Sequence, residues 1–385
     1  MAPDELAVPR LDRVAREIHT CSRCGFCRIW DWKGVRWVCP TYPYTEGYDT
    51  QYARGRLTMA QAVQSGQAQI SQLFLEHLAQ CCLCGSCATH CPAGIPLAEV
   101  WHALRADLAE QGHLLEAHRQ VAENVRDHHN VFGPVRRSAN APVEEARPVK
   151  VLYFAGCQTN RKARQIRAAT VELLGKLGSD FAVIGDAVCC GYPLYEIGAE
   201  TGLRDNAAYT AGRIAAYRPD VILTTCIGCY RALHNLYPQE LGVQLGGAVM
   251  HAHDFFAERL PANLAPVQRR VTFHDPCIMV RNLGIVDEPR ALLRRIPGLE
   301  LVEMYSNRED TLCCGAGGGV LSAFTDIAGR VAEERVRQAA DAGAAQLVTS
   351  CPSCVVNLKR SVSRAGVDVQ VSDIVELLNE AVPVG

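Results

Sequence analysis

Nineteen cysteines dominate the chemistry available to this sequence of 385 residues, and ten of them form two sets with the same spacing. Each set has two adjacent cysteines followed by glycine, one cysteine 32 to 36 residues before this pair, and a C-x-x-C 35 or 36 residues after the glycine. The first set is Cys157, Cys189, Cys190, Cys226 and Cys229, and the second is Cys277, Cys313, Cys314, Cys351 and Cys354. Five thiolates exceed what tetrahedral zinc or a single cubane uses, so the spacing predicts a larger or distorted iron-sulfur cluster at each set.

Eight further cysteines near the N-terminus repeat the spacing of bacterial-type ferredoxins. Cys81 to Pro92 is a complete C-x2-C-x2-C-x3-C-P run, and Cys21 to Pro40 is the same run with eleven residues before its fourth cysteine. In this motif the fourth cysteine ligates the other cluster. One 4Fe-4S cubane is therefore assigned to Cys21, Cys24, Cys27 and Cys91, and the second to Cys39, Cys81, Cys84 and Cys87. Structural zinc uses four-cysteine sets built from C-x2-C pairs, which these triplets do not match.

The composition favours a globular, metal-binding protein over a disulfide scaffold. Nineteen cysteines in 385 residues are a lower density than that of a small secreted disulfide scaffold, and paired C-x-x-C spacings indicate metal. Met1 to Thr20 has no apolar signal segment, and no stretch reaches the roughly 18 apolar residues that span a bilayer. We therefore expect a cytoplasmic chain that meets a membrane only through a partner. A formal charge of −2 with scattered basic residues gives no footprint for nucleic acid, which favours protein or small-molecule partners.

The residue pattern divides the chain into three parts. Apolar spacing predicts a short amphipathic helix over 4–19 and further helices from 97 to 129. Three prolines and paired charges between Gly133 and Pro148 are typical of a connector. We expect a two-cluster ferredoxin-like domain at 1–132, a first cysteine-rich domain at 149–262 and a second at 268–385.

Beyond the connector, strands and helices alternate, which predicts an α/β domain with parallel sheets. The first half has predicted strands at 150–157, 181–190 and 220–226, and helices at 161–177 and 203–217. The second has predicted strands at 270–277, within 299–314 and at 346–351, and helices at 289–296 and 322–342. The halves repeat at an offset of 120 to 125 residues, which indicates an internal duplication. Every cysteine group falls where a strand ends, so each half should place five thiolates at the ligand-binding edge of its sheet.

Several other residues have two interpretations. The gap between Cys27 and Cys39 holds three of the four tryptophans and either walls a cluster off from water or, with Arg28 and Arg36, forms a docking surface for a redox partner. Cys82 is left over and is expected to be a small buried hydrophobe. The glycines from Gly315 to Gly319 lack the lysine and serine of a phosphate loop, so we interpret them as letting the backbone approach a cluster closely.

Histidine and lysine side chains near the cysteines offer candidate proton donors, although satisfied core or outer-shell histidines are commoner. His90, beside Cys91, is interpreted as a satisfied polar residue rather than a ligand. The candidates that remain open are His251, His253, His274 with Asp275, and Lys359. The sequence favours none of them as a catalytic residue.

The duplicated C…C-C-G…C-x-x-C sets resemble the CCG repeat of heterodisulfide reductase subunits, and the ferredoxin part resembles the small iron-sulfur subunit fused in front of it. The fusion of the two parts resembles the D-type subunit, and this resemblance covers nearly the whole chain. The resemblance implies that each complete set binds a noncubane 4Fe-4S cluster and that the two clusters lie close together and open a disulfide between them. By position, it assigns the five cysteines of each set as the ligands. The segments C-C-G-Y-P-L-Y-E-I-G from Cys189 and C-C-G-A-G-G-G from Cys313 are closer to the heterodisulfide-reductase-like forms than to the iron-sulfur subunits of flavin-dependent dehydrogenases.

Two alternatives come from similar fusions. Cys39-Pro40-Thr41-Tyr42 followed by Ala53-Arg54-Gly55-Arg56 is similar to iron-sulfur subunits of flavin-dependent glycolate, lactate and glycerol-3-phosphate dehydrogenases, and the D-type component of benzoyl-CoA reductase complexes is also similar. We expect an iron-sulfur oxidoreductase subunit that takes electrons from a flavoprotein or another iron-sulfur partner and delivers them to a disulfide. The alternatives are a relay subunit without a substrate of its own and a zinc-stabilised scaffold.

Overall fold

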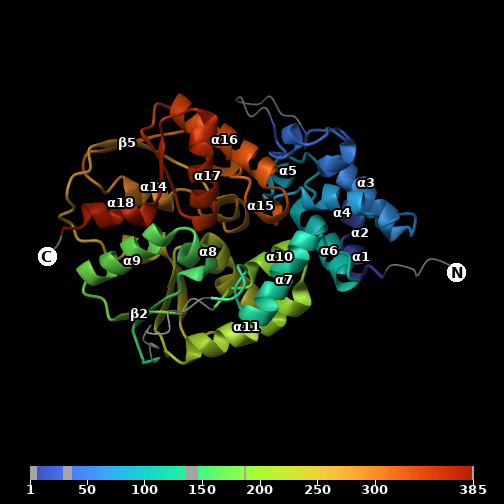
Figure 1. The fold of residues 1–385 in the computed structure, drawn as a ribbon. Coiled ribbons are helices and arrows are strands. Elements are labelled where there is room, and N and C mark those ends of the chain that lie inside the picture. The colour runs from blue at the N-terminus through green and yellow to red at the C-terminus, as the bar shows by residue number, and fades with distance from the viewer. Residues whose placement is uncertain (1–6, 29–36, 136–145, 186–187, 384–385) are drawn as a thin grey trace.

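The computed structural model describes residues 7–28, 37–135, 146–185 and 188–383. The tryptophan-rich gap at 29–36 and most of the expected connector, at 136–145, lie outside the described residues. A helical N-terminal region is followed by two α/β halves, with the first half below the second in Figure 1 and the N-terminal helices beside both. The mixed α/β class is confirmed.

The N-terminal region is built from short helices around a core that includes Leu11, Ile18 and Trp101. Its elements are α1 (Pro9–Arg13), α2 (Ala15–His19), η1 (Tyr42–Tyr44), η2 (Asp49–Gln51), α3 (Ala53–Gln64), α4 (Gln72–Ala79), α5 (Ser86–Thr89), α6 (Leu97–Glu110) and α7 (Glu116–His128). The single helix predicted over 4–19 is wrong in detail, because Val14 leaves the helical conformation at φ −108° and ψ 21° and separates α1 from α2. The helices predicted between 97 and 129 are present as α6 and α7.

Each half contains one four-stranded parallel sheet, and the strand orders β2-β1-β3-β4 and β6-β5-β7-β8 are the same. The first half contains β1 (Val151–Tyr153), α8 (Gly156–Arg161), α9 (Arg164–Lys176), β2 (Phe181–Val183), α10 (Tyr192–Ile197), α11 (Glu200–Ala215), β3 (Val221–Thr224), α12 (Ile227–Arg231), η3 (Ala232–Glu240), β4 (Ala248–His251) and α13 (Ala252–Ala257). In its sheet Leu152 pairs with Ile222, and the equivalent pair in the second sheet is Thr272 with Leu347. The duplication predicted from the spacing is therefore present in the topology.

The second half repeats this order with small changes. It contains β5 (Arg269–Phe273), η4 (Ile278–Asn282), α14 (Glu288–Leu293), β6 (Leu299–Val302), η5 (Arg308–Asp310), α15 (Val320–Ala323), α16 (Thr325–Asp341), β7 (Gln346–Thr349), α17 (Pro352–Ala365), β8 (Gln370–Asp373) and α18 (Ile374–Ala381). The predicted helix over 322–342 is broken at Phe324, where φ is −134° and ψ is 61°.

Several predicted strands were too long. The strand predicted over 150–157 ends at Tyr153, and the one predicted over 181–190 ends at Val183. Gly156 has φ +77°, which L side chains rarely adopt, and it starts helix α8, which carries Cys157. The fourth strands β4 and β8 were not predicted from the sequence. Each lies at the edge of its sheet, where pairing on one side gives a weaker hydrophobic pattern.

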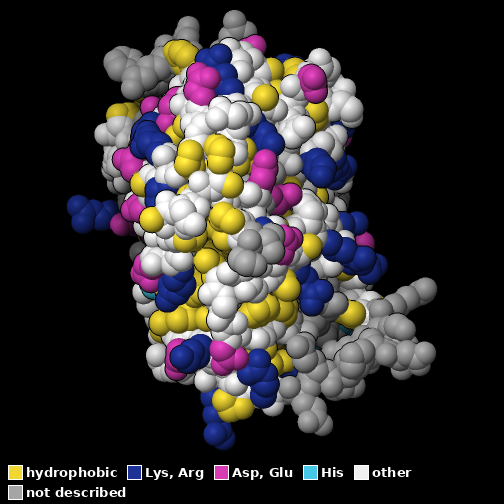
Figure 2. Space-filling view, turned by 90° about the vertical axis from the view of Figure 1, so that its left-hand side faces the viewer, with side chains coloured by type: hydrophobic (Ala, Val, Ile, Leu, Met, Phe, Trp, Pro, Cys, Tyr) yellow, Lys and Arg dark blue, Asp and Glu magenta, His cyan; other side chains and the backbone are white. Residues whose placement is uncertain are grey.

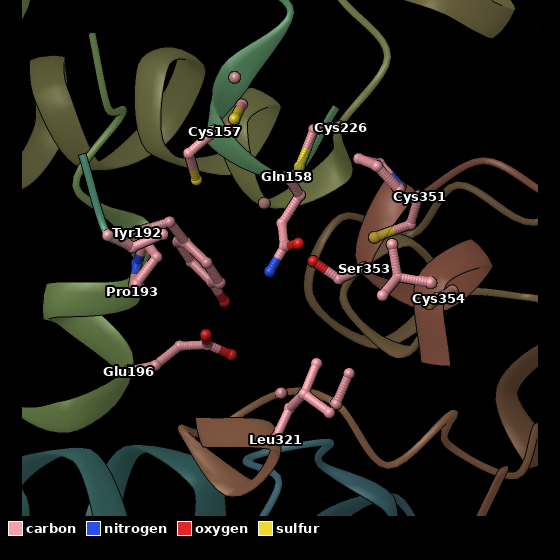
Figure 3. A pocket seen from close by; sticks show the side chains of 18 of the residues that line it. Cys157, Gln158, Tyr192, Pro193, Glu196, Cys226, Leu321, Cys351, Ser353 and Cys354 are labelled. Atoms are coloured by element: carbon pink, nitrogen blue, oxygen red, sulfur yellow. The ribbon is translucent and has the colours of Figure 1, made fainter. Parts of the chain in front are cut away.

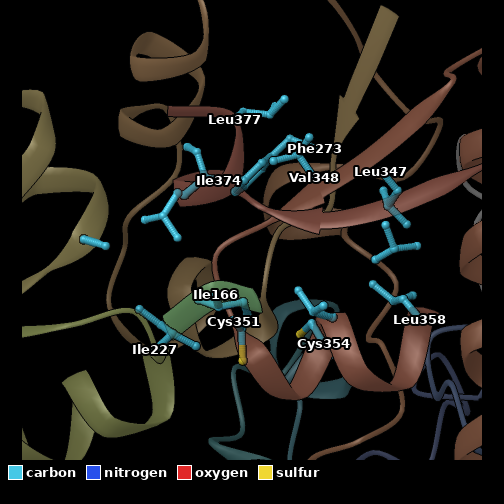
Figure 4. Packing of buried hydrophobic residues seen from close by; sticks show 14 of the residues in the cluster. Ile166, Ile227, Phe273, Leu347, Val348, Cys351, Cys354, Leu358, Ile374 and Leu377 are labelled. Carbon is cyan, nitrogen blue, oxygen red and sulfur yellow. The ribbon is translucent and has the colours of Figure 1, made fainter. Parts of the chain in front are cut away.

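One hydrophobic core joins the two halves. Ile166 and Ile227 of the first half belong to the same buried cluster as Phe273, Leu358 and Ile374 of the second, as Figure 4 shows. Burial of apolar surface is the main favourable term in domain association, so this shared core holds the two sheets in a fixed relation. The two cysteine sets are positioned by that relation.

The outer surface carries charges of both signs. Figure 2 shows the face turned away from the N-terminal helices, where basic and acidic side chains are interspersed with hydrophobic ones. Among the residues that the structure describes, no helix combines the length and the hydropathy needed to cross a bilayer.

Candidate iron-sulfur sites and the cavity between them

The C-x-x-C pair of each half occupies the beginning of a helix that follows a central strand. Cys226 is the N-cap of α12 after β3, and Cys351 is the N-cap of α17 after β7. The second cysteine of each pair, Cys229 or Cys354, lies in the first turn of the same helix. Free N–H groups at the beginning of a helix stabilise a thiolate, and the backbone N–H groups of Gly228 and Cys229 contribute to lowering the pKa of Cys226.

The adjacent cysteines of each half lie in a loop after the edge strand of the sheet. The N–H of Gly191 lies 3.4 Å from the sulfur of Cys189, and Gly315 makes the same contact with Cys313. In the first half Asn206 Nδ2 donates to the carbonyl of Cys189 at 2.7 Å. The loop after the edge strand therefore has the same contact between the glycine N–H and the first sulfur of the pair in both halves.

All five thiols of the first set are buried and are close neighbours. Cys157 and Cys190 both interact with Cys189, and the hydrogen bond from Cys157 is the largest cause that lowers the pKa of Cys189 well below its usual value. Cys229, followed by Cys351 of the other half, lowers the pKa of Cys226 in the same way. Hydrogen bonding to neighbouring cysteines raises the pKa of the other three, Cys157, Cys190 and Cys229. Five buried cysteines in mutual contact, two of them with lowered pKa values, are suited to binding a metal.

The second set has the same arrangement. The sulfur of Cys277 lies 3.8 Å from that of Cys313, and Cys313 and Cys354 lower the pKa of Cys314 to about 6 by hydrogen bonding. A ring nitrogen of His274 and the sulfurs of Cys314 and Cys354 lie within 4.8 Å of one another. The second set therefore contains a nitrogen donor beside its thiols.

The two sets face each other across a cavity of about 390 Å³. Eight of the ten cysteines line this cavity: Cys157, Cys190, Cys226, Cys229, Cys277, Cys314, Cys351 and Cys354. Polar side chains from both halves point into the same space, as Figure 3 shows for Gln158, Tyr192, Glu196 and Ser353. Cys226 and Cys351 interact directly across the boundary between the halves.

Glu196 of α10 is the acidic group of the cavity. Its Oε1 accepts a hydrogen bond of 2.8 Å from the N–H of Gly318, in the loop of the other half. Burial raises the pKa of Glu196 to about 7, and the charges of Arg105 and Arg231 oppose that shift. The neighbouring Tyr192 accepts a hydrogen bond of 2.9 Å from Arg231 at its hydroxyl. Sequence reasoning missed Glu196 and Tyr192, because Glu196 contacts Gly318 of the other half and Tyr192 contacts Arg231, which is 39 residues away.

The ferredoxin-like cysteines gather in two small cavities. Cys21, Cys24, Cys27 and Cys91 line one of them. The other is lined by Cys39, Cys81, Cys84 and Cys87, together with Cys82. The structure thus brings together the two groups of four that the crossed ferredoxin pattern pairs.

The second of these cavities adjoins the second cysteine set. The thiols of Cys82 and Cys84 both interact with Cys313, and Cys82 also donates to the carbonyl of Gly315 at 3.6 Å. Arg281 of the second half also contacts this part of the N-terminal region, because its Nη1 donates to the carbonyl of Cys84 at 3.0 Å. Cys82 is buried as expected, but it is also a neighbour of the second set, which its spacing did not reveal.

The glycine loop after Cys314 packs on the N-terminal region. A Cβ at Gly318 would lie 2.1 Å from the carbonyl oxygen of Cys81, so only glycine fits this close approach. Arg105 of α6 donates from Nη1 to the carbonyls of Glu196 and Gly318, both at 2.8 Å. This single guanidinium therefore joins the N-terminal region to both halves.

The open histidine and lysine candidates lie at different places. His251, the last residue of β4, and His253 of α13 are buried and hydrogen-bond to each other, outside the cavity. Lys359 is exposed on α17 and also lies outside the cavity. His90 contacts the carbonyl of Ser86 at 2.8 Å, in keeping with its interpretation as a satisfied polar residue.

His274 and Asp275 are both buried and both paired with arginine. Arg335 donates to Nδ1 of His274 at 3.0 Å, and burial, followed by the charge of Arg335, lowers the pKa of His274 to about 3. Arg290 forms a fully buried ion pair with Asp275 at 2.6 Å. Because Arg335 and Arg290 are distant in sequence, the spacing gave no signal for either partner.

Comparisons with known proteins agree with this architecture. Residues 151–234 and 271–359 both match the family of the cysteine-rich domain, and residues 17–95 match the 4Fe-4S dicluster domain. Lactate utilization protein A of Macrococcus caseolyticus is 31% identical over 61% of this chain and 98% of its own length. A hypothetical protein from Helicobacter pylori shares the fold, with a TM-score of 0.58, 11% identity, and coverage of 97% of this chain and 72% of that one.

The match that decides the family covers almost the whole chain. The D-type subunit of the dihydromethanophenazine:CoB–CoM heterodisulfide reductase of Methanosarcina barkeri is 32% identical over 95% of this chain and 94% of its own length. The dicluster region and both cysteine-rich halves lie within this chain. The chain therefore belongs to the family of D-type heterodisulfide reductase subunits, a group of iron-sulfur oxidoreductase proteins.

Proposed function

We propose that this iron-sulfur subunit reduces a disulfide bound in the cavity between its two cysteine sets. The observation that carries the proposal is the cavity of about 390 Å³, which eight cysteines line, four from each half. A disulfide has two sulfur atoms that separate on reduction. A space with a thiolate set on each side matches that requirement.

The residues present fit iron-sulfur groups. The two sets and the two small cavities offer thiols, and every described cysteine is free rather than bonded in a disulfide. Thiolate-rich sites with these spacings are the usual ligands of iron-sulfur clusters, which when bound supply and accept single electrons at low potential. We assign the crossed groups of four as cubane ligands. The five cysteines of each set would hold noncubane 4Fe-4S clusters.

The contacts between cysteines place the second set nearer to the ferredoxin-like region than the first set. Cys84, assigned to a cubane, touches Cys313 of the second set, and Cys351 of the second set touches Cys226 of the first. Electrons that enter through the ferredoxin-like region would therefore meet the second set before the first. Their external source, in this proposal, is a flavoprotein or another iron-sulfur protein.

A residue of the cavity would supply one of the two protons that disulfide reduction needs. Reduction of a disulfide RSSR consumes two electrons and two protons and releases two thiols, so the cleaved S–S bond must be balanced by proton transfer. Glu196 is protonated below about pH 7 and points into the cavity, so its carboxyl can give a proton to one departing thiolate. The second proton comes from solvent. The walls of the cavity are largely apolar and include Phe132 and Leu321.

A turnover assay tests this function. The purified protein, reduced under anaerobic conditions, is mixed with heterodisulfides, and the released thiols are counted against electrons consumed. Two thiols for each pair of electrons would support the proposal. Fewer than about eight iron atoms per chain would contradict the two cubanes.

The second candidate function is an electron relay without a substrate of its own. The likeness to lactate utilization protein A favours it, because the name of that relative refers to the use of lactate and not to a disulfide. In this case the partner is a flavin-dependent 2-hydroxyacid dehydrogenase or an acyl-CoA reductase complex. Co-purification of a flavoprotein, with no thiol released from any disulfide, would support the relay and contradict disulfide reduction.

A further inference from the structure

The two cysteine sets differ at one matched position after the first strand of each sheet. Phe154 follows β1, and its N–H donates to the carbonyl of Leu223 at 2.7 Å. His274 follows β5, and its N–H donates to the carbonyl of Val348 at the same distance. Each lies three residues before the first cysteine of its set, and both side chains are fully buried. The duplication therefore puts a phenyl ring beside one set and an imidazole beside the other.

Arg335 decides which nitrogen of His274 carries the proton. A guanidinium has donors and no acceptor, so the 3.0 Å contact from Arg335 Nε requires Nδ1 of His274 to be the acceptor. The neutral ring then carries its proton on Nε2. Arg335 is itself fixed, because its Nη1 donates to the carbonyl of Ser306 at 2.7 Å and its Nη2 to Thr311 at 3.1 Å. The tautomer is set by this buried network.

The proton on Nε2 has no partner among the described residues. This nitrogen is buried without a hydrogen bond, and an unpaired buried donor is costly. Since Nδ1 is occupied by Arg335, Nε2 is the nitrogen available to the sulfurs of Cys314 and Cys354, which lie within 4.8 Å of the ring nitrogen. A sulfur atom between His274 and these two cysteines would accept a hydrogen bond from Nε2 and so pair the buried donor.

We propose that His274 donates a hydrogen bond from Nε2 to a sulfur of the iron-sulfur group held by the second set, and that the first set lacks this donor because Phe154 stands at the matched position. This inference rests on the proposed loading of both sets with iron-sulfur groups. Hydrogen bonds to cluster sulfurs stabilise the reduced, more negative form and raise the reduction potential. The second set then holds an electron more readily than the first. His274 is a positioning residue with no iron bond of its own, because the lone pair of Nδ1 accepts from Arg335 and Nε2 carries the proton.

The test is a redox titration followed by electron paramagnetic resonance on the full chain. The signals of the two sets are assigned by their loss in Cys313→Ser and Cys189→Ser. His274→Phe copies the first half into the second, and Phe154→His makes the reverse change. His274→Gln keeps an acceptor for Arg335 and an N–H for the sulfur.

We expect His274→Phe to keep the iron content and to lower the ratio of reduced to oxidised second set by about fivefold at a fixed potential, the effect of one neutral hydrogen bond. His274→Gln should stay within about twofold of the unmodified chain, and Phe154→His should raise the ratio for the first set.

Three results would overturn the proposal. These are an unchanged titration in His274→Phe, loss of iron from the second set in both His274 variants, and a Phe154→His protein that folds but titrates unchanged. If His274→Phe does not fold, the other two variants decide. Absence of iron from both sets in the unmodified chain would instead contradict the proposed function.

Discussion

The two halves of the duplicated region have the same sheets and the same cysteine spacing, but their surroundings differ. The first set has Phe154 and Ala155 at the end of its first strand and faces Tyr192 and Glu196 of its own half. The second set has a buried histidine and aspartate there. It also touches the ferredoxin-like cysteines, whereas the first set does not make that junction among the described contacts. The duplication kept the cysteine spacing and changed the neighbours: the second set adjoins the ferredoxin-like cysteines, and the acidic Glu196 belongs to the first half.

The largest effects are expected when one cysteine is replaced in either half, which tests whether the two sets differ in role. Cys313→Ser should abolish the signal of the second set and stop reduction of the disulfide, because Cys313 adjoins Cys84. Cys189→Ser should abolish the first signal and still allow the second set to be reduced. Each change should remove about four iron atoms, measured by iron analysis beside the resonance spectra. Loss of the cubane signals in either variant would contradict the assignment of the cysteines.

The next largest effect is expected at Glu196, whose counterpart in the second half is Val320. Replacing Glu196 by Gln should lower the rate of disulfide reduction by about 100-fold, the usual contribution of a positioned acid. In the unmodified chain the rate should fall as pH rises above about 7, because the raised pKa keeps Glu196 protonated only below that value. The pH profile of Glu196→Gln should lose this decline.

The raised pKa of Glu196 also makes the free energy of unfolding depend on pH. Since the pKa of Glu196 is raised from 4.5 to about 7 in the folded chain, the folded state binds more protons than the unfolded state between these values. The free energy of unfolding should therefore decrease as pH rises through that window, and Glu196→Gln should flatten the slope. A variant that is slower but keeps the full slope would mean that Glu196 is ionised in the fold.

A smaller effect is expected at the buried ion pair found only in the second half. Asp275 pairs with Arg290, both side chains are fully buried, and the matched residue of the first half is Ala155. Asp275→Ala should lower the free energy of unfolding by about 3 kcal/mol, because it leaves a buried guanidinium with one partner fewer. Asp326→Ala, which breaks an exposed pair with Arg364, should cost less than about 1 kcal/mol. Equal losses in denaturant unfolding would show that burial does not set the difference.

Much of the fold was predictable because the signals for it are local. The ferredoxin run around Cys81 and the repeated C-C-G motif are fixed spacings, and buried strands such as Val221–Thr224 are continuous apolar runs. The edge strand β4 was missed because its residues are more exposed than those of β3. The length of the strand before Cys189 was overestimated, since an apolar run continues past the residues that pair in the sheet.

The sequence by itself determined the number of thiols, their grouping in fours and fives, and the duplication of the sheets, because ligand spacing and strand periodicity are properties of short segments. Only the tertiary structure decided that the two sets face one cavity, that Cys84 meets Cys313, and that Arg335 fixes the proton of His274. These contacts join residues far apart in the chain. They depend on how the shared core docks one sheet against the other, which no local pattern encodes.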